Sequence, residues 1–253
     1  MSTEIASSDA ELDEVIARLD GPPRPDGLTW PGQDGPRLVV AAAADGQVRA
    51  VVRRLVRRYA PPPSRRPTDL ATDRTLPDLP PIGVLPLYGA RFFEVPTDPA
   101  EVAKSVVHGT ASRLDLLRTD AGSVTLDGAL LGGSAAFTAR VEVDDAVLAN
   151  SGEQIAACVI GNGRRYATVD GLPFVPDADP ADGVLNVAVA IPVRVRSRWG
   201  RTETRIEVRR AQGRAVSVTP YGEVSFLDDG VAGTLDRKRS WWVERGAWAV
   251  FRP

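Results

Sequence analysis

The spacing of apolar and polar residues changes part-way along this chain of 253 residues. In the first part, the apolar runs at 38–44 and 82–87 are short enough for buried strands, while 9–19, 48–59 and 98–107 repeat their apolar positions with the period of a helix. The alternation of strands with helices predicts an α/β layer.

From Arg113 onward the pattern changes to short alternating runs separated by glycine, asparagine and aspartate turns. Such runs are typical of strands, so the second part is predicted to be mainly β. A domain boundary is expected near 110–114, with the last strands free to lie in either domain. The predicted strands are 114–118, 123–126, 136–143, 154–160, 184–195, 204–209, 215–219 and 248–251.

The first strand runs through a turn of small residues directly into a helix, and this turn is the most informative stretch of the sequence. Backbone N–H groups at a helix start are unpaired and lie at the positive end of the helix dipole, so small residues there let an anion approach. Ala43 and Ala44 stand where glycine would allow a closer approach, and Gln47 stands where a hydroxyl would suit a phosphate. An ordinary strand-to-helix turn with Asp45 as the helix N-cap is the open alternative.

Composition describes a globular chain, with 43% apolar and 25% charged residues. The apolar run 38–44 is far shorter than the roughly 18 to 20 residues of a membrane-spanning helix, and the acidic N-terminus lacks the pattern of a signal peptide. A cytoplasmic protein is therefore expected. A single cysteine, Cys158, excludes an internal disulfide, and a single histidine, His108, excludes histidine-rich metal sites.

Charge is nearly balanced at −2 but is unevenly distributed. Residues 1–35 carry eight acids and two bases, whereas residues 37–67 carry eight arginines and one acid. Arg49, Arg53 and Arg57 repeat at i, i+4 spacing along the predicted helix. This basic face is either solvated or contacts phosphate or an anionic membrane surface, which would place the protein peripherally at the membrane. Nucleic acid is not expected, because the few aromatic residues are not interleaved with the basic ones.

The order of several short motifs resembles the diacylglycerol kinase and bacterial lipid kinase family, which has an NAD kinase-like fold. The motifs are the first strand with its Asp45-Gly46 turn and basic helix, the second strand, and a helix that begins at Asp98-Pro99. In the β-rich part the matching segments are 113–116, 161–163, 176–187 and 227–230. Together these motifs span almost the whole chain.

The resemblance implies an α/β nucleotide-binding-like domain (1–112) and a C-terminal β-sandwich domain (113–253), with ATP and a lipid hydroxyl meeting in a cleft between them. Asp45, Gly46 and Gln47 then match the phosphate turn that binds ATP. Asp229 matches the candidate catalytic base, and Asp182 matches an acidic position for Mg²⁺. Without the resemblance, the favoured interpretation of Asp182-Gly183 and Asp229-Gly230 is that they are ordinary hairpin-turn dipeptides.

Four departures from the family pattern predict impaired phosphoryl transfer. The chain has no counterpart of the first strand with its asparagine-proline turn, and the glycine-rich phosphate turn reads Ala43-Ala-Asp-Gly-Gln47. The polar segment after the second strand reads Leu87-Tyr-Gly-Ala-Arg91, and Val231 replaces the closing glutamate. Losing one such contact costs roughly 3 kcal/mol of transition-state stabilisation, so four losses would leave little kinase activity.

Three functions are compatible with these observations. The first is a degenerate lipid-kinase-like protein, a pseudokinase that binds a lipid, a hydrophobic small molecule or a partner. The second is an active kinase that uses ATP and Mg²⁺ to phosphorylate diacylglycerol, another lipid or a small alcohol. The third is a cleft repurposed for ATP-free chemistry on a hydrophobic metabolite. The missing first strand would also leave a sheet edge open, which predicts a homodimer.

Overall fold

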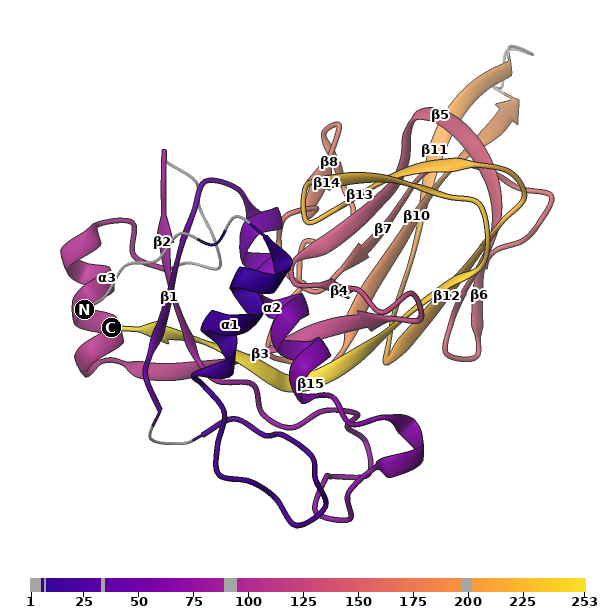
Figure 1. The fold of residues 1–253 in the computed structure, drawn as a ribbon. Helices are drawn as coiled ribbons and strands as arrows, with labels where there is room; N and C mark the ends of the chain where they lie inside the picture. Colours follow the sequence, from indigo (N-terminus) through magenta and orange to yellow (C-terminus); the bar gives the residue numbers. More distant parts are fainter. Residues whose placement is uncertain (1–5, 7, 33–34, 89–94, 197–201) are drawn as a thin grey trace. The chain divides into compact units, whose positions relative to one another are not determined.

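The computed structural model of the chain describes residues 6, 8–32, 35–88, 95–196 and 202–253. It is mostly sheet with few helices (Figure 1). The chain forms two compact units: unit 1 comprises Met1–Leu114 and Glu244–Pro253, and unit 2 comprises Asp115–Val243. The end of the chain therefore belongs to the same unit as its beginning. The cleft between two domains stays a prediction.

The helices of unit 1 begin at the capping residues that the sequence contains. In α1 (Asp9–Ala17), the Ser8 hydroxyl accepts a hydrogen bond from the Glu11 N–H at 3.2 Å. In α3 (Pro99–His108), the Asp98 carboxylate accepts from two N–H groups of the first turn. The long basic helix is α2 (Asp45–Tyr59). The three predicted helices are thus confirmed, and His108 lies in the last turn of α3.

The sheet of unit 1 consists of β1 (Leu38–Ala42), β2 (Ile82–Pro86) and the end of β15 (Arg239–Arg252). β1 and β2 are parallel, which requires a crossover such as α2 between them. α3 packs on one side of this sheet and α2 on the other (Figure 1). Gly83 of β2 lets α3 come close, because a Cβ there would collide with Val106.

The uneven charge distribution is explained by the packing of the N-terminal segment on α2. The buried Arg54 guanidinium pairs with Asp9, at 3.0 Å, and with Asp13, both from α1. Arg58 pairs with Asp20, which follows α1. The acids of the first 35 residues therefore neutralise part of the basic helix, and only some of its arginines face solvent.

Unit 2 is almost entirely antiparallel sheet. Its central order is β12-β5-β7-β10-β11, with β6 and β13 also paired to β5 and β14 paired to β13. Two strands, β3 and β15, cross the boundary between the units. The strands are β3 (Thr110–Thr119), β4 (Val124–Thr125), β5 (Gly128–Val143), β6 (Ala146–Ala149), β7 (Gln154–Gly161), β8 (Thr168–Val169), β9 (Leu172–Pro173), β10 (Leu185–Arg196), β11 (Thr202–Gly213), β12 (Ala215–Pro220), β13 (Val224–Asp228) and β14 (Val231–Leu235).

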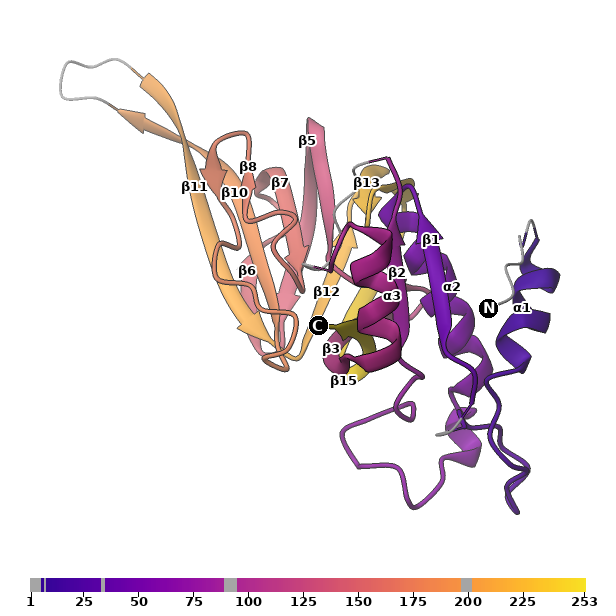
Figure 2. The ribbon, with the colours of Figure 1, turned by 90° about the vertical axis from the view of Figure 1, so that its left-hand side faces the viewer.

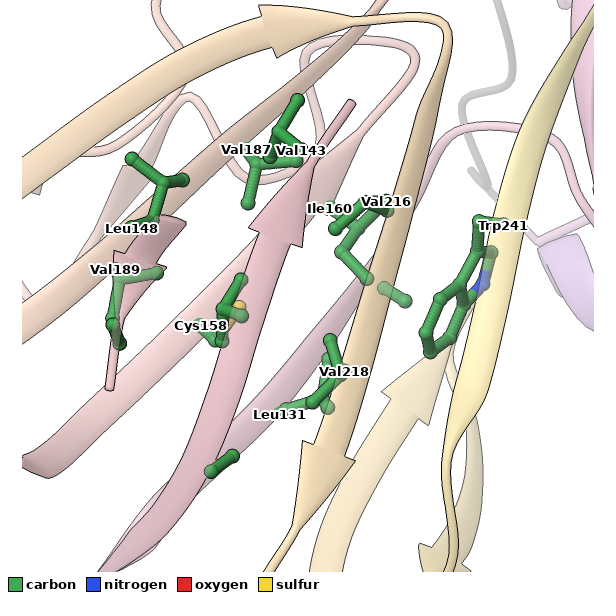
Figure 3. Close-up of a cluster of buried hydrophobic side chains, with 14 of the residues drawn as sticks. Leu131, Val143, Leu148, Cys158, Ile160, Val187, Val189, Val216, Val218 and Trp241 are labelled. Atoms are coloured by element: carbon green, nitrogen blue, oxygen red, sulfur yellow. The ribbon is translucent and has the colours of Figure 1, made fainter. Parts of the chain in front are cut away.

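One apolar cluster forms the main core of unit 2 (Figure 3). It collects inward-facing side chains from β5, β7, β10 and β12, and Trp241 of β15 lies at one side of it, 1% exposed. Cys158 is fully buried in this cluster, and burial raises the pKa of its thiol to about 12. Cys158 therefore packs as a small buried hydrophobic residue.

Several strands are longer than the sequence pattern predicts, β5 and β15 most of all. β5 begins at Gly128 rather than Ala136. Its first part escaped prediction because it is rich in glycine and because its register shifts between Gly132 and Phe137. β15 begins at Arg239 rather than Trp248, and its charged residues hide the alternation. One of these, Glu244, is fully buried, and its carboxylate accepts a 2.9 Å hydrogen bond from the Thr75 N–H.

In the described ranges, no helix combines the length and the apolar character that crossing a bilayer requires.

Candidate functional site

Residues 43–47, here called the phosphate-like turn, join β1 to α2 in unit 1. β1 ends at Ala42 and α2 begins at Asp45, so the turn has the strand-to-helix geometry that the sequence predicts. Ala43 and Ala44 are both exposed. In this position, backbone N–H groups are available to an anion unless the chain itself supplies an acceptor.

The chain does supply an acceptor, the side chain of Gln47. Its Oε1 accepts hydrogen bonds from the N–H groups of Ala43, at 2.6 Å, and Ala44, at 3.3 Å. The N–H of Gln47 donates to the Ala44 carbonyl at 3.0 Å. Three of the five backbone N–H groups in the phosphate-like turn thus have partners inside the turn.

Asp45 is the first residue of α2, and Ala44 is the N-cap. The alternative interpretation of Asp45 as the N-cap is therefore wrong. An acidic side chain in the first turn stabilises the helix dipole, and its negative charge opposes the approach of a free anion to the same end. Gly46 follows as the second helical residue, and both residues are half-buried.

The segment that follows β2 also lies near the end of β1, since the Leu87 N–H donates to the Ala42 carbonyl at 2.7 Å. Tyr88 comes next, with φ at 54° and its side chain 95% exposed. The other residues of the departing segment 87–91 lie outside the described residues.

Asp229, the candidate base, lies in unit 2 between β13 and β14 and is 1% exposed. Its Oδ2 accepts from the Leu126 N–H at 2.7 Å, and its Oδ1 accepts from the N–H groups of Asp127 and Gly128 at 2.9 and 3.1 Å. This carboxylate therefore binds three consecutive backbone N–H groups between β4 and β5. Its φ of 48° lies in the left-handed region, which aspartate tolerates in turns.

Asp229 belongs to a larger group of polar residues, buried except for the half-buried Asp127, here called the unit 2 polar network. Asn162 is fully buried, and its Nδ2 donates to the carbonyls of Asp115 and Leu126 at 2.9 and 2.7 Å. The Asp115 carboxylate accepts from the Gly183 N–H at 2.6 Å. The polar side chains of the network are Asp115, Thr125, Asp127, Asn162, Asp228 and Asp229.

Asp127 is a member of the network whose carboxyl pKa is shifted by its surroundings. Burial raises the pKa of its carboxyl to about 6, the Arg165 N–H opposes this rise, and the charge of Asp229 adds to it. Its Oδ1 accepts from the Arg165 N–H at 3.2 Å. The sequence analysis did not select Asp127 or Asp115. In the sequence, the Asn162-Gly163 turn is the feature that points to them. Gly163 packs against Asp127, since a Cβ there would collide with the Asp127 carboxylate.

Asp182, the candidate Mg²⁺ ligand, is exposed, and its Oδ1 accepts from the Val184 N–H at 3.0 Å. This hydrogen bond closes a local turn of the kind that aspartate commonly makes. Within the described parts of the chain, no group of three or more histidine, cysteine, aspartate or glutamate side chains is arranged to hold a metal ion. Asp182 and Asp229 are in unit 2, whereas Asp45, Gly46 and Gln47 are in unit 1.

The arginines selected on α2 differ in their surroundings. Arg53 and Arg57 are exposed, whereas Arg49 is half-buried. The described residues also line cavities. One of about 140 Å³ in unit 1 is lined by residues that include Arg37 and Phe251, and one of about 250 Å³ in unit 2 is lined by residues that include Gln154 and Tyr221. Neither cavity is lined by a predicted site residue.

The chain has the fold shared by diacylglycerol kinase-like structures and an NAD kinase. A diacylglycerol kinase from Bacillus anthracis superimposes with a TM-score of 0.63 at 14% identity, over 98% of this chain and 83% of that one. A putative diacylglycerol kinase from the same organism gives 0.60 at 16% identity, over 87% and 77%.

An NAD kinase from Archaeoglobus fulgidus, in complex with ATP, gives a TM-score of 0.51 at 14% identity, over 85% of this chain and 76% of that one. No family model and no curated protein sequence matches the chain. The resemblance read from the sequence is confirmed as a relationship of fold.

Proposed function

We propose that this chain is a diacylglycerol kinase-like protein that has lost ATP-dependent phosphoryl transfer and binds a lipid or another hydrophobic small molecule. The observation that carries the proposal is the contact of Gln47 Oε1 with the N–H groups of Ala43 and Ala44. A neutral amide oxygen of the chain itself takes the place that a phosphate oxygen would need at this helix start.

The surroundings of the phosphate-like turn act in the same direction. Ala43 and Ala44 add Cβ atoms where glycine would let a phosphate come closer to the backbone. The Asp45 carboxylate in the first turn of α2 repels an anion that lacks a bound cation. ATP would therefore have to displace Gln47 and also accept a less favourable electrostatic environment.

Titration calorimetry with Mg-ATP tests this proposal. The wild-type protein should show no binding at millimolar nucleotide, whereas a variant with Ala43→Gly, Ala44→Gly and Gln47→Thr should gain measurable binding. Arg53→Gln, an exposed change on the same helix, is the control and should behave as wild type. Wild-type binding with a micromolar Kd would overturn the proposal.

An active lipid or small-alcohol kinase is the second candidate, favoured by the ATP complex of the related NAD kinase. In this function Asp229 is the base, Asp45 lies near Mg²⁺, and Asp182 contributes to metal binding. Transfer of labelled γ-phosphate to diacylglycerol, abolished in a folded Asp229→Asn protein, would establish it. Absence of transfer by the wild-type protein to diacylglycerol and to short alcohols would exclude it for those acceptors.

The homodimer also remains part of the proposal. Among the described strands, β1 pairs with β2 alone and forms an end of the sheet order. A second copy could extend the sheet at this edge. Light scattering should then give twice the mass of the 253-residue chain, and a monomer at micromolar concentration would contradict the expectation.

A further inference from the structure

The ends of β10 and β11 form a two-stranded ribbon that extends beyond the other strands of unit 2 (Figures 1 and 2). The two strands pair along their whole length, from Leu185 opposite Gly213 to Arg196 opposite Thr202. Because residues directly opposite each other point to the same face, the register assigns every side chain of the ribbon to one of two faces.

The first face, here called the paired face, continues the main core of unit 2 outward. Opposite pairs on it are Ile191 with Glu207, Val193 with Arg205, and Val195 with Glu203. Each arginine of this face has an acidic partner: Arg205 lies 3.9 Å from Glu203, and Arg209 lies 2.8 Å from Glu207. The paired face is thus close to neutral.

The second face, here called the cationic face, has a different composition. Opposite pairs on it are Pro192 with Ile206, Arg194 with Thr204, and Arg196 with Thr202. Arg194, Arg196 and the two threonines are exposed, and 42% of Ile206 is exposed. Across the described residues, neither Arg194 nor Arg196 forms an ion pair. None of the three opposite pairs named above places an acidic residue on this face.

We propose that the cationic face of the β10–β11 ribbon docks on the anionic surface of a lipid bilayer. Two exposed guanidinium groups beside an exposed isoleucine match that surface, because the arginines reach lipid phosphates while the apolar side chain enters the interface. The face has no aromatic side chain among its described residues for base stacking, so it fits a nucleic acid poorly. The inference is independent of ATP binding or catalysis.

Sedimentation with vesicles tests this docking. The wild-type protein should bind vesicles of phosphatidylcholine with 30% phosphatidylserine and not vesicles of phosphatidylcholine alone, and 1 M salt should release it. Arg194→Gln and Arg196→Gln should each weaken binding about fivefold, and the double variant roughly 25-fold, on the usual contribution of one arginine near a charged membrane. Added to the double variant, Ile206→Ser should weaken vesicle binding further, because it removes the exposed apolar side chain.

Arg205→Gln is the matched control, because it removes the same charge from the same ribbon on the paired face. It should bind as wild type does. Thermal unfolding should be unchanged in all these variants, since the substituted side chains are exposed.

Four results would overturn the proposal. They are the absence of wild-type binding to the charged vesicles, an equal loss in Arg205→Gln, a loss confined to the α2 variant Arg53→Gln/Arg57→Gln, and tighter wild-type binding to a DNA duplex than to vesicles. Because the assay contains no nucleotide, its failure is distinguishable from failure of the proposed function.

Discussion

The sequence resemblance predicts kinase-site roles for the phosphate-like turn of unit 1 and for the Asp229 carboxylate of unit 2, and in both the hydrogen-bonding groups are occupied by the chain itself. In the turn, exposed backbone donors are occupied by the side chain of Gln47. At Asp229, the acceptors of a buried carboxylate are occupied by three backbone donors. The first arrangement is exposed, so we expect its loss to cost little stability, whereas the second is buried in unit 2.

Asp229→Ala should produce the largest loss of stability. It leaves the N–H groups of Leu126, Asp127 and Gly128 without their acceptor in a buried site, and it places alanine at a positive φ. We expect the free energy of unfolding to fall by about 3 to 5 kcal/mol in urea denaturation.

Asp229→Asn is the matched variant. Asparagine tolerates the positive φ and keeps one acceptor oxygen, but its NH₂ group would face a backbone donor, so the loss should be about 1 to 3 kcal/mol. A loss below about 0.5 kcal/mol for Asp229→Ala would contradict this account, because the three hydrogen bonds of the carboxylate would then contribute little to folding.

Arg54→Ala should have the next largest effect. The variant loses the ion pairs to Asp9 and Asp13 and the packing of the buried arginine stem, and we expect a loss of about 2 kcal/mol with weaker docking of α1. Proteolysis near residue 20 should become faster. Arg53→Ala, one residue earlier and exposed, should change stability by less than about 0.5 kcal/mol. Equal effects of the two substitutions would show that the ion pairs between Arg54 and α1 do not stabilise the fold.

Asp127 gives the network a predicted pH dependence. Its pKa of about 6 in the folded protein lies above the ordinary value of 3.8, so the folded state binds more protons between these values. The free energy of unfolding should therefore fall as the pH rises from about 4 to about 6, by about 2 kcal/mol from this group after allowing for its partial exposure.

Asp127→Asn should remove this contribution while keeping an acceptor for the Arg165 N–H. Urea denaturation of both proteins at pH 4, 5, 6 and 7 measures the difference. Parallel pH profiles for wild type and variant would contradict the assignment.

Among the substitutions that remove an interaction, Gln47→Ala should have the smallest effect on stability. Two exposed hydrogen bonds at a helix start contribute about 0.5 to 1 kcal/mol together, because water can replace the side-chain oxygen. Thermal unfolding at neutral pH checks this expectation. A loss above about 3 kcal/mol would mean that the glutamine is a structural element and not a replaceable acceptor.

The sequence predicted the local elements better than the contacts between distant residues. Capping residues such as Ser8 and Asp98 and the apolar run of β1 specify their elements through neighbours in the chain, so these were predictable. The pairing of Arg54 with α1 and of Asp229 with the backbone of 126–128 joins residues far apart in sequence. For Gln47 the contact is local, but the sequence alone does not decide whether the amide points back to the turn.

The chemical shifts of the Ala43 and Ala44 amides, followed by ¹⁵N NMR during titration with Mg-ATP, test the central claim most directly. The account predicts that both amides shift when Gln47 is replaced by alanine, and that in the wild-type protein neither moves as nucleotide is added. Saturable wild-type shifts of these two amides at micromolar Mg-ATP would contradict it, because the phosphate-like turn would then still bind phosphate.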